Sequence, residues 1–119
     1  MPDTDDPMSF LSRLFGAGAP TLSPRAFVAE RDVSAPVLDV RTPKEFAAGH
    51  LRGAVNADVL AADFAARVER LGLPADGPVY VCCASGMRSG KAAARLRAMG
   101  HAGAVNVGGV GALRAAGAQ

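Results

Sequence analysis

The sequence is poor in aromatic residues, in cysteine and in net charge. Its 119 residues include no tryptophan and one tyrosine, although half of all residues are apolar. The interior must therefore be filled mainly by alanine, leucine and valine. At this length we expect one domain with a single sizeable core.

Cysteine occurs only at two adjacent positions, Cys82 and Cys83. Neighbouring cysteines cannot crosslink distant segments, so the chain is not a disulfide scaffold. A free thiol suits a reducing compartment, and we expect a cytoplasmic protein. The sequence shows no cluster of residues with metal-ligand spacing, so we expect neither a metal nor another cofactor.

The charge pattern argues against two further classes of function. The net charge is only +2 and no cluster of lysine and arginine forms a stripe, which argues against a nucleic-acid partner. Asp3, Asp5 and Asp6 lie where a secretory signal needs positive charge. The apolar run that follows is interrupted by Ser12 and Arg13, so we expect no export signal and no membrane segment.

The first twenty residues differ in composition from the rest. An acidic, proline-containing start leads into a short apolar stretch at residues 10–15. That stretch could form one helical turn docked on the domain or on a partner, or belong to a flexible extension. We expect an extension over residues 1–20 and a folded domain over residues 21–119.

Strand and helix patterns alternate along residues 21–119. Apolar runs typical of buried strands occupy residues 37–40, 54–56, 79–83 and 104–107. Helical patterns, several with capping residues, occupy residues 23–30, 42–48, 58–71, 89–99 and 110–116. This alternation predicts an α/β fold with a parallel sheet and helices on both faces. Functional sites in such folds lie at the carboxyl ends of the strands.

The chemistry is concentrated where the strand at residues 79–83 passes through a small loop into the next helix. Loop N–H groups and a helix N-terminus pointing inward would stabilise a thiolate or a bound oxyanion. Such a site lowers the pKa of a cysteine and makes it a nucleophile at neutral pH. Alternatively, both cysteines are only small apolar residues at a strand end. Gly86, Arg88 and Ser89 suit the anion site.

Two spacings compete for the nucleophile. Five residues separate Cys82 from Arg88, which is the spacing of cysteine phosphatases. Those enzymes place glycine three residues after the nucleophile, but that position is Ser85 when counted from Cys82. Counted from Cys83, the third residue is Gly86 and four residues precede Arg88. Cys83 is therefore our candidate nucleophile.

The stretch from Cys83 to Ser89 resembles the active loop of the rhodanese family of sulfurtransferases, commonly Cys-Arg-Ser-Gly-Asn-Arg followed by Ser. Residues 37–56 resemble the upstream signature of that family, and Gly108-Gly109 resembles its double glycine. These blocks occur in the family's order and cover most of residues 21–113. The resemblance implies a single small α/β domain with a five-stranded, mostly parallel sheet.

The resemblance also implies a reaction. Cys83 would accept a sulfane sulfur from thiosulfate or a persulfide, and would pass it to cyanide, a thiol or a protein thiol. Neither nucleic acid nor a membrane would be a partner. The substrate would be bound by the rest of the loop, namely Ala84, Ser85, Gly86, Met87, Arg88 and Ser89.

Residues outside the loop are expected to support it. Asp39 and Arg41 would tie a strand end to the active loop. Glu45 would mainly cap the helix at residues 42–48, and His50 would order the segment that follows. Cys82 should point to the opposite side of its strand from Cys83 and pack in the core.

Three positions depart from the family pattern. Ala84 stands where members that use thiosulfate often carry a cation, Met87 replaces a small polar residue, and Leu113 replaces an aromatic one. Arg88 is then the only cation of the loop, either bound to the donor or paired with a carboxylate. Two other functions remain open: an inactive binding or regulatory module of the same fold, and a phosphatase or arsenate reductase that uses Cys82.

Overall fold

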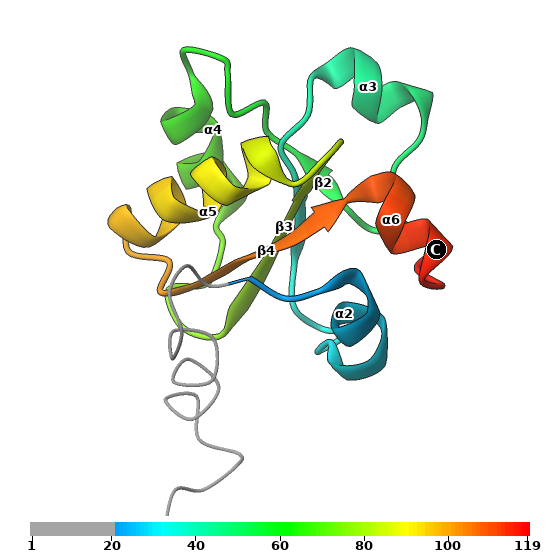
Figure 1. The fold of residues 1–119 in the computed structure, drawn as a ribbon. Helices are drawn as coiled ribbons and strands as arrows, with labels where there is room; N and C mark the ends of the chain where they lie inside the picture. The colour runs from blue at the N-terminus through cyan, green and yellow to red at the C-terminus, as the bar shows by residue number, and fades with distance from the viewer. Residues whose placement is uncertain (1–20) are drawn as a thin grey trace, which may run out of the picture.

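A computed structural model describes residues 21–119 of the chain. The extension expected over residues 1–20 lies outside the described residues. The strands are β1 (Val37–Asp39), β2 (Val55–Asn56), β3 (Pro78–Cys83) and β4 (Gly103–Gly109). They form one parallel sheet in the order β2-β1-β3-β4 (Figure 1). The predicted α/β class with a parallel sheet is therefore confirmed.

The described part of the sheet has four strands, one fewer than the resemblance implied. On the free side of β4, Thr21 forms a single parallel bridge with Asn106, and the N–H of Leu22 donates to the Asn106 carbonyl at 2.8 Å. Ser23 then caps a helix that has Pro24 at its first position. Because proline has no N–H to donate to a strand, the chain leaves the sheet after one bridge.

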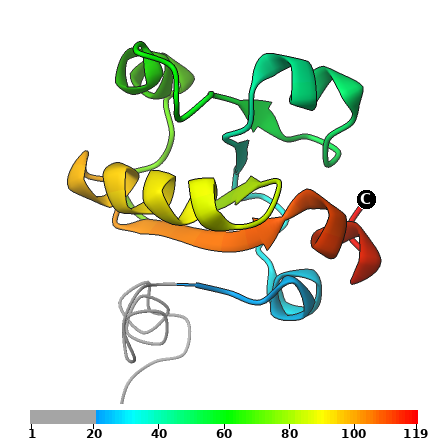
Figure 2. The same ribbon diagram turned by 45° about the horizontal axis from the view of Figure 1, so that its top comes forward.

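Helices cover both faces of the sheet, and Figure 2 shows α5 and α2 on opposite sides of β4. The helices are α2 (Pro24–Glu30), α3 (Pro43–Ala48), α4 (Phe64–Leu71), α5 (Met87–Ala98) and α6 (Val110–Ala115). Side chains alternate along β3 as a strand requires. Val81 packs with Phe64 of α4 and Leu96 of α5. Tyr80 packs on the other side with Phe27 of α2, edge to face at 5.0 Å.

The caps predicted from the sequence are present. The Ser23 hydroxyl accepts the N–H of Ala26 at 3.1 Å, and Thr42 and Glu45 form a reciprocal capping box at the start of α3.

Within residues 21–119, no helix is long and apolar enough to cross a membrane.

Two helix starts differ from the prediction. The helix expected from residue 58 begins at Phe64, because the Asp58 carboxylate accepts the N–H of Leu60 at 2.9 Å and holds a turn there. The helix expected from residue 89 begins at Met87, directly after Gly86, whose φ of +96° makes the turn out of β3. Glycine is suited to this position because it has no Cβ to strain a positive φ.

Candidate active site

Cys83 is the last residue of β3, and its side chain is fully buried at the base of the loop. Its Sγ atom accepts the N–H of Gly86 at 3.0 Å, and the Ser89 hydroxyl lies 3.3 Å from the same sulfur. Strand, loop and helix thus bring Cys83, Gly86 and Ser89 together, as the sequence predicted. The sulfur lies among hydrogen-bond donors that stabilise a negative charge.

Burial and hydrogen bonding act on the pKa of the Cys83 thiol in opposite directions. Burial raises this pKa, whereas hydrogen bonds from the Ser89 hydroxyl and from the N–H groups of Ser89, Ser85 and Gly86 lower it. The hydrogen bonds prevail, so the net pKa lies below that of an ordinary thiol. A larger fraction of Cys83 is therefore thiolate, the nucleophilic form, at neutral pH.

Cys82 has the opposite environment. Its side chain points to the other side of β3 and packs with Phe27 and Tyr80. Burial, followed by the nearby Asp39 carboxylate, raises the pKa of the Cys82 thiol to about 12. Cys82 is thus a neutral core residue, and the phosphatase spacing counted from it does not match the geometry.

Asn106 on β4 is a site residue that the sequence analysis missed. Its Nδ2 donates to the Gly86 carbonyl at 3.0 Å, and its Oδ1 accepts the N–H of Gly108 at 2.9 Å. The Oδ1 atom also lies 2.6 Å from the Ser89 hydroxyl, which shares its single proton between Asn106 and the Cys83 sulfur. One side chain therefore joins the loop, the start of α5 and the end of β4. Its sequence signal was a lone polar residue in the apolar run at residues 104–107.

The end of β4 also supports the loop, because Gly109 packs against the backbone of Ala84. A Cβ atom at Gly109 would collide with the Ala84 carbonyl, so the two backbones meet at a distance that only glycine allows. The pairing of β3 with β4 shifts register between Val81 and Cys82, which brings Cys83 opposite Gly109. The double glycine noted in the sequence thus lies against the candidate active loop.

Arg88 pairs with a carboxylate, one of the two roles considered for it. Its Nη1 and Nη2 atoms donate to Glu45 Oε1 and Oε2 at 2.8 and 2.9 Å. These bonds, and then the N–H of Thr42, lower the pKa of the Glu45 carboxyl to about 2. Glu45 is more than the helix cap we expected, because it also fixes Arg88 and balances its charge.

Asp39 and Arg41 support the site indirectly. The buried Asp39 carboxylate binds Arg41 Nη2 at 2.7 Å, and the same nitrogen donates to the Gly49 carbonyl at 2.7 Å. Asn56 Nδ2 donates to the carbonyls of Asp39 and Arg41 at 3.0 and 2.9 Å. These bonds hold the end of β1 to both ends of the α3 segment, which carries Glu45. The pair therefore supports the loop through α3 and not by the direct tie we expected.

His50 orders the segment after α3, as the sequence suggested. Its Nδ1 lies 2.8 Å from the Phe46 carbonyl oxygen, and its ring stacks on the Phe46 ring at 3.7 Å. Among the described residues no group of three or more histidine, cysteine or acidic side chains could hold a metal ion.

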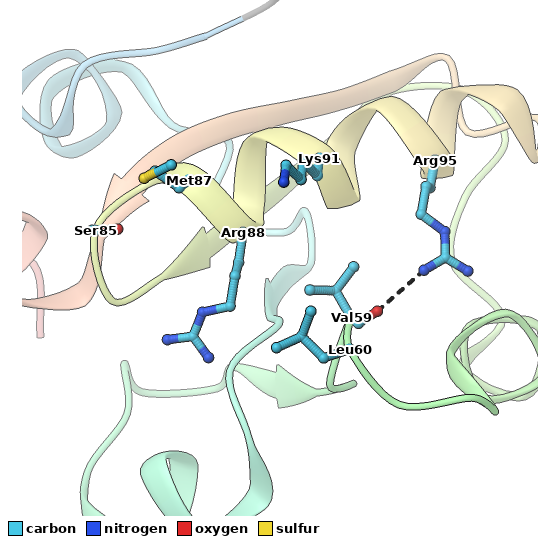
Figure 3. A pocket seen from close by; sticks show the side chains of 7 residues that line it. All are labelled: Val59, Leu60, Ser85, Met87, Arg88, Lys91 and Arg95. Carbon is cyan, nitrogen blue, oxygen red and sulfur yellow. Dashed lines mark hydrogen bonds between the residues drawn. The ribbon is translucent and has the colours of Figure 1, made fainter.

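An open cleft of about 480 Å³ lies beside the loop (Figure 3). One wall is the segment after β2 and the other is the part of α5 from Met87 to Arg95, where the side chains of Arg88 and Arg95 extend toward that segment. The lining residues are Val59, Leu60, Ser85, Met87, Arg88, Lys91 and Arg95. The cleft leads to the exposed side of the loop, where Ala84 and Ser85 meet solvent.

Replacing Glu45 with glutamine should show how much its charge contributes to stability. Glutamine can still cap α3. At pH 7 we expect a loss of less than about 1 kcal/mol, because the ion pair with Arg88 is partly exposed. The native carboxyl has a pKa of about 2 against an ordinary value of 4.5, so its contribution is present above pH 4.5 and is lost as the pH falls toward 2. Urea unfolding of both proteins at several pH values measures this difference.

Glu69→Gln is the matched control, because Glu69 is exposed on α4 and has no ion pair within residues 21–119. Its stability should follow that of the wild type at every pH. A Glu45→Gln deficit that is as large at pH 2 as at pH 7 would show that packing, and not charge, is responsible.

Comparison with known proteins agrees with this geometry. Residues 24–116 match the model of the rhodanese-like domain family. The chain is 35% identical over 89 residues to the thiosulfate sulfurtransferase GlpE of Pseudomonas entomophila, a match that covers 74% of this chain and 77% of GlpE. It is 38% identical over 66 residues to the uncharacterized protein YqhL of Bacillus subtilis, covering 56% of this chain. The match covers 49% of YqhL, so the chain spans about half the length of that relative.

Solved structures show the same fold. The rhodanese-like domain of an Anabaena protein superposes with a TM-score of 0.70 at 23% identity, covering 83% of this chain and 76% of that one. A human single-domain sulfurtransferase superposes with a TM-score of 0.54 at 30% identity, covering 78% of this chain and 92% of that one. Together with the match over residues 24–116, these similarities show that the chain belongs to the rhodanese-like domain family.

Proposed function

We propose that the protein is a sulfurtransferase that carries a sulfane sulfur as a persulfide on Cys83. The observation that carries this proposal is the environment of the Cys83 sulfur, which receives the Gly86 N–H and faces the Ser89 hydroxyl while its pKa is lowered. The resemblance to proteins named sulfurtransferases supports it. Both cysteines are free, which suits a reducing, cytoplasmic setting.

The reaction takes place in two displacements. The Cys83 thiolate attacks the outer sulfur of thiosulfate or of a persulfide; the S–S bond of the donor breaks, and its electron pair leaves with sulfite or with a thiolate. An acceptor, cyanide or a thiolate, then attacks the outer sulfur on Cys83 and releases the Cys83 thiolate. Each step exchanges one S–S bond for a new bond to sulfur, so no outside oxidant is needed. Inward N–H groups stabilise the anionic sulfur in both forms.

Mass spectrometry of the protein after treatment with thiosulfate or polysulfide tests the proposal. We expect a gain of one sulfur on the peptide that contains Cys83, and its loss when cyanide is added. No gain with either donor would favour a binding or regulatory module of the same fold. Hydrolysis of an aryl phosphate that depends on Cys82 would instead favour phosphatase chemistry.

Adding a cation to the loop should improve the use of thiosulfate. Thiosulfate carries two negative charges and leaves as sulfite, but the charge of Arg88 is already balanced by Glu45. Ala84 is exposed, so arginine can be accommodated there. For Ala84→Arg we expect kcat/KM for thiosulfate to rise about fivefold, the effect of one partly exposed charge. An uncharged alkyl persulfide should gain much less.

The measurement is kcat/KM for both donors at two salt concentrations, since salt screens an exposed charge. Equal gains for the two donors, or a thiosulfate gain that salt does not reduce, would contradict the role of charge. In that case the shape of the loop, through Met87, would be the better explanation.

A further inference from the structure

The cleft beside the loop has apolar walls that a compact inorganic anion would not use. Four large apolar side chains of residues 21–119 are exposed, and two of them, Leu60 and Met87, each 73% exposed, line this cleft. Val59 lies beside Leu60 on the same wall. A volume of about 480 Å³ falls in the range of pockets that bind organic ligands. The exposed apolar surface is therefore suited to the carbon chain of a substrate.

The positive charge of the cleft that has no acidic partner among the described residues lies further along α5 than the loop. Arg88 is balanced by Glu45, whereas neither Lys91 nor Arg95 has an acidic partner among the described residues. Arg95 is held in place by the Val59 carbonyl at 3.1 Å and by the Phe64 ring at 4.6 Å. The Lys91 side chain is exposed and makes no hydrogen bond or ion pair within residues 21–119, and Figure 3 shows it between Arg88 and Arg95 on α5.

Helix geometry sets how far this charge lies from the N-terminal end of α5, which adjoins the loop. Met87 is the first residue of α5, and Lys91 and Arg95 lie one and two turns further along this helix, roughly 6 and 12 Å along the axis. An anionic group bound there would be separated from the sulfur in the loop by a spacer that crosses Leu60 and Met87. Thiosulfate cannot reach from the sulfur in the loop to Lys91, because it has no carbon chain and its charges lie on the S–SO3 unit that reacts.

We infer that Lys91, supported by Arg95, forms a carboxylate subsite, and that the preferred donor is an aliphatic persulfide with a carboxylate at the far end of its chain. The inference rests on the proposed function. The Cys83 thiolate attacks the outer sulfur of R–S–SH, the donor S–S bond breaks, and R–S⁻ leaves while Cys83 becomes the persulfide. The carbon chain lies on Leu60 and Met87, and the carboxylate meets Lys91.

Two matched donors test the inference, the persulfides of 6-mercaptohexanoate and of 6-mercaptohexanol, which differ only in the terminal carboxylate. For the wild type at low salt we expect kcat/KM to be about fivefold higher with the carboxylate donor. Lys91→Glu should abolish or reverse this preference, and Lys91→Ala should reduce it. Arg25→Glu makes the same change of charge on α2, on the other face of the sheet, and should keep the preference of the wild type.

The outcomes separate the subsite from the function. A preference that Lys91→Glu leaves unchanged, or an equal fall with both donors, would overturn the subsite while sulfur transfer stands. If mass spectrometry finds no sulfur on Cys83 of the wild type with either persulfide, the subsite fails. If thiosulfate and polysulfide also add no sulfur, the proposed function fails with it. The expected result is that Lys91→Glu loses the preference and Arg25→Glu keeps it, while both variants still use the hydroxyl donor.

Discussion

In Cys83→Ser the rate of sulfur transfer should fall by more than about 10³-fold, the scale expected when a covalent nucleophile is removed. A serine hydroxyl at this position is far too basic to ionise where the thiol does, although it can still accept the Gly86 N–H that now reaches the sulfur. The fold should therefore remain intact. Steady-state transfer from thiosulfate or an alkyl persulfide to cyanide measures the loss, and circular dichroism checks the fold.

Cys82→Ser is the matched control, because it makes the same exchange one residue away on the opposite side of β3. It should keep most of the transfer activity. It should also lose about 1–3 kcal/mol of stability, since a hydroxyl replaces a fully buried thiol among apolar neighbours. If Cys82→Ser were the inactive variant and Cys83→Ser remained active, the assignment of the nucleophile would be wrong.

Gly109→Ala should lower both stability and transfer activity, because Gly109 packs against the backbone of the candidate active loop. The φ of Gly109 is −89°, which alanine adopts without strain, so the effect comes from the collision of the new Cβ with the Ala84 carbonyl. We expect a loss of stability of about 1–3 kcal/mol from overpacking. We also expect kcat/KM to fall about 100-fold per folded molecule, because displacement of the loop moves the donors that face Cys83. Urea unfolding and transfer kinetics measure the two effects.

Gly103→Ala provides the comparison within the same strand. Gly103 begins β4, and a Cβ there would collide with the Gly77 carbonyl, at the opposite end of the sheet from the loop. We expect a similar loss of stability but unchanged transfer per folded molecule. The pH dependence of Cys83 alkylation should move to higher pH in Gly109→Ala only. Equal activity in the two variants would show that the contact between Gly109 and Ala84 does not position the loop.

The predictions that were confirmed depend on residues close together in the chain. Ser23-Pro24 and the Thr42 to Glu45 capping box are determined by contacts three residues apart. The opposite orientation of Cys82 and Cys83 follows from the alternation of side chains along a strand. The start of α4 was predicted six residues too early, because the hydrogen bond from Leu60 to Asp58 competes with a helix that the apolar spacing favours.

By itself, the amino-acid sequence determined the α/β class and the family resemblance, and it singled out Cys83 as the candidate nucleophile. The tertiary structure alone decided how the site is held together. Glu45 and Arg88 are 43 residues apart in the chain, and Asn106 is 20 residues from Gly86. They meet because parallel strands bring their carboxyl ends to one edge of the sheet, and the register between β3 and β4 places Gly109 against the loop. Sequence separation does not constrain such pairings, which depend on how the strands and helices pack.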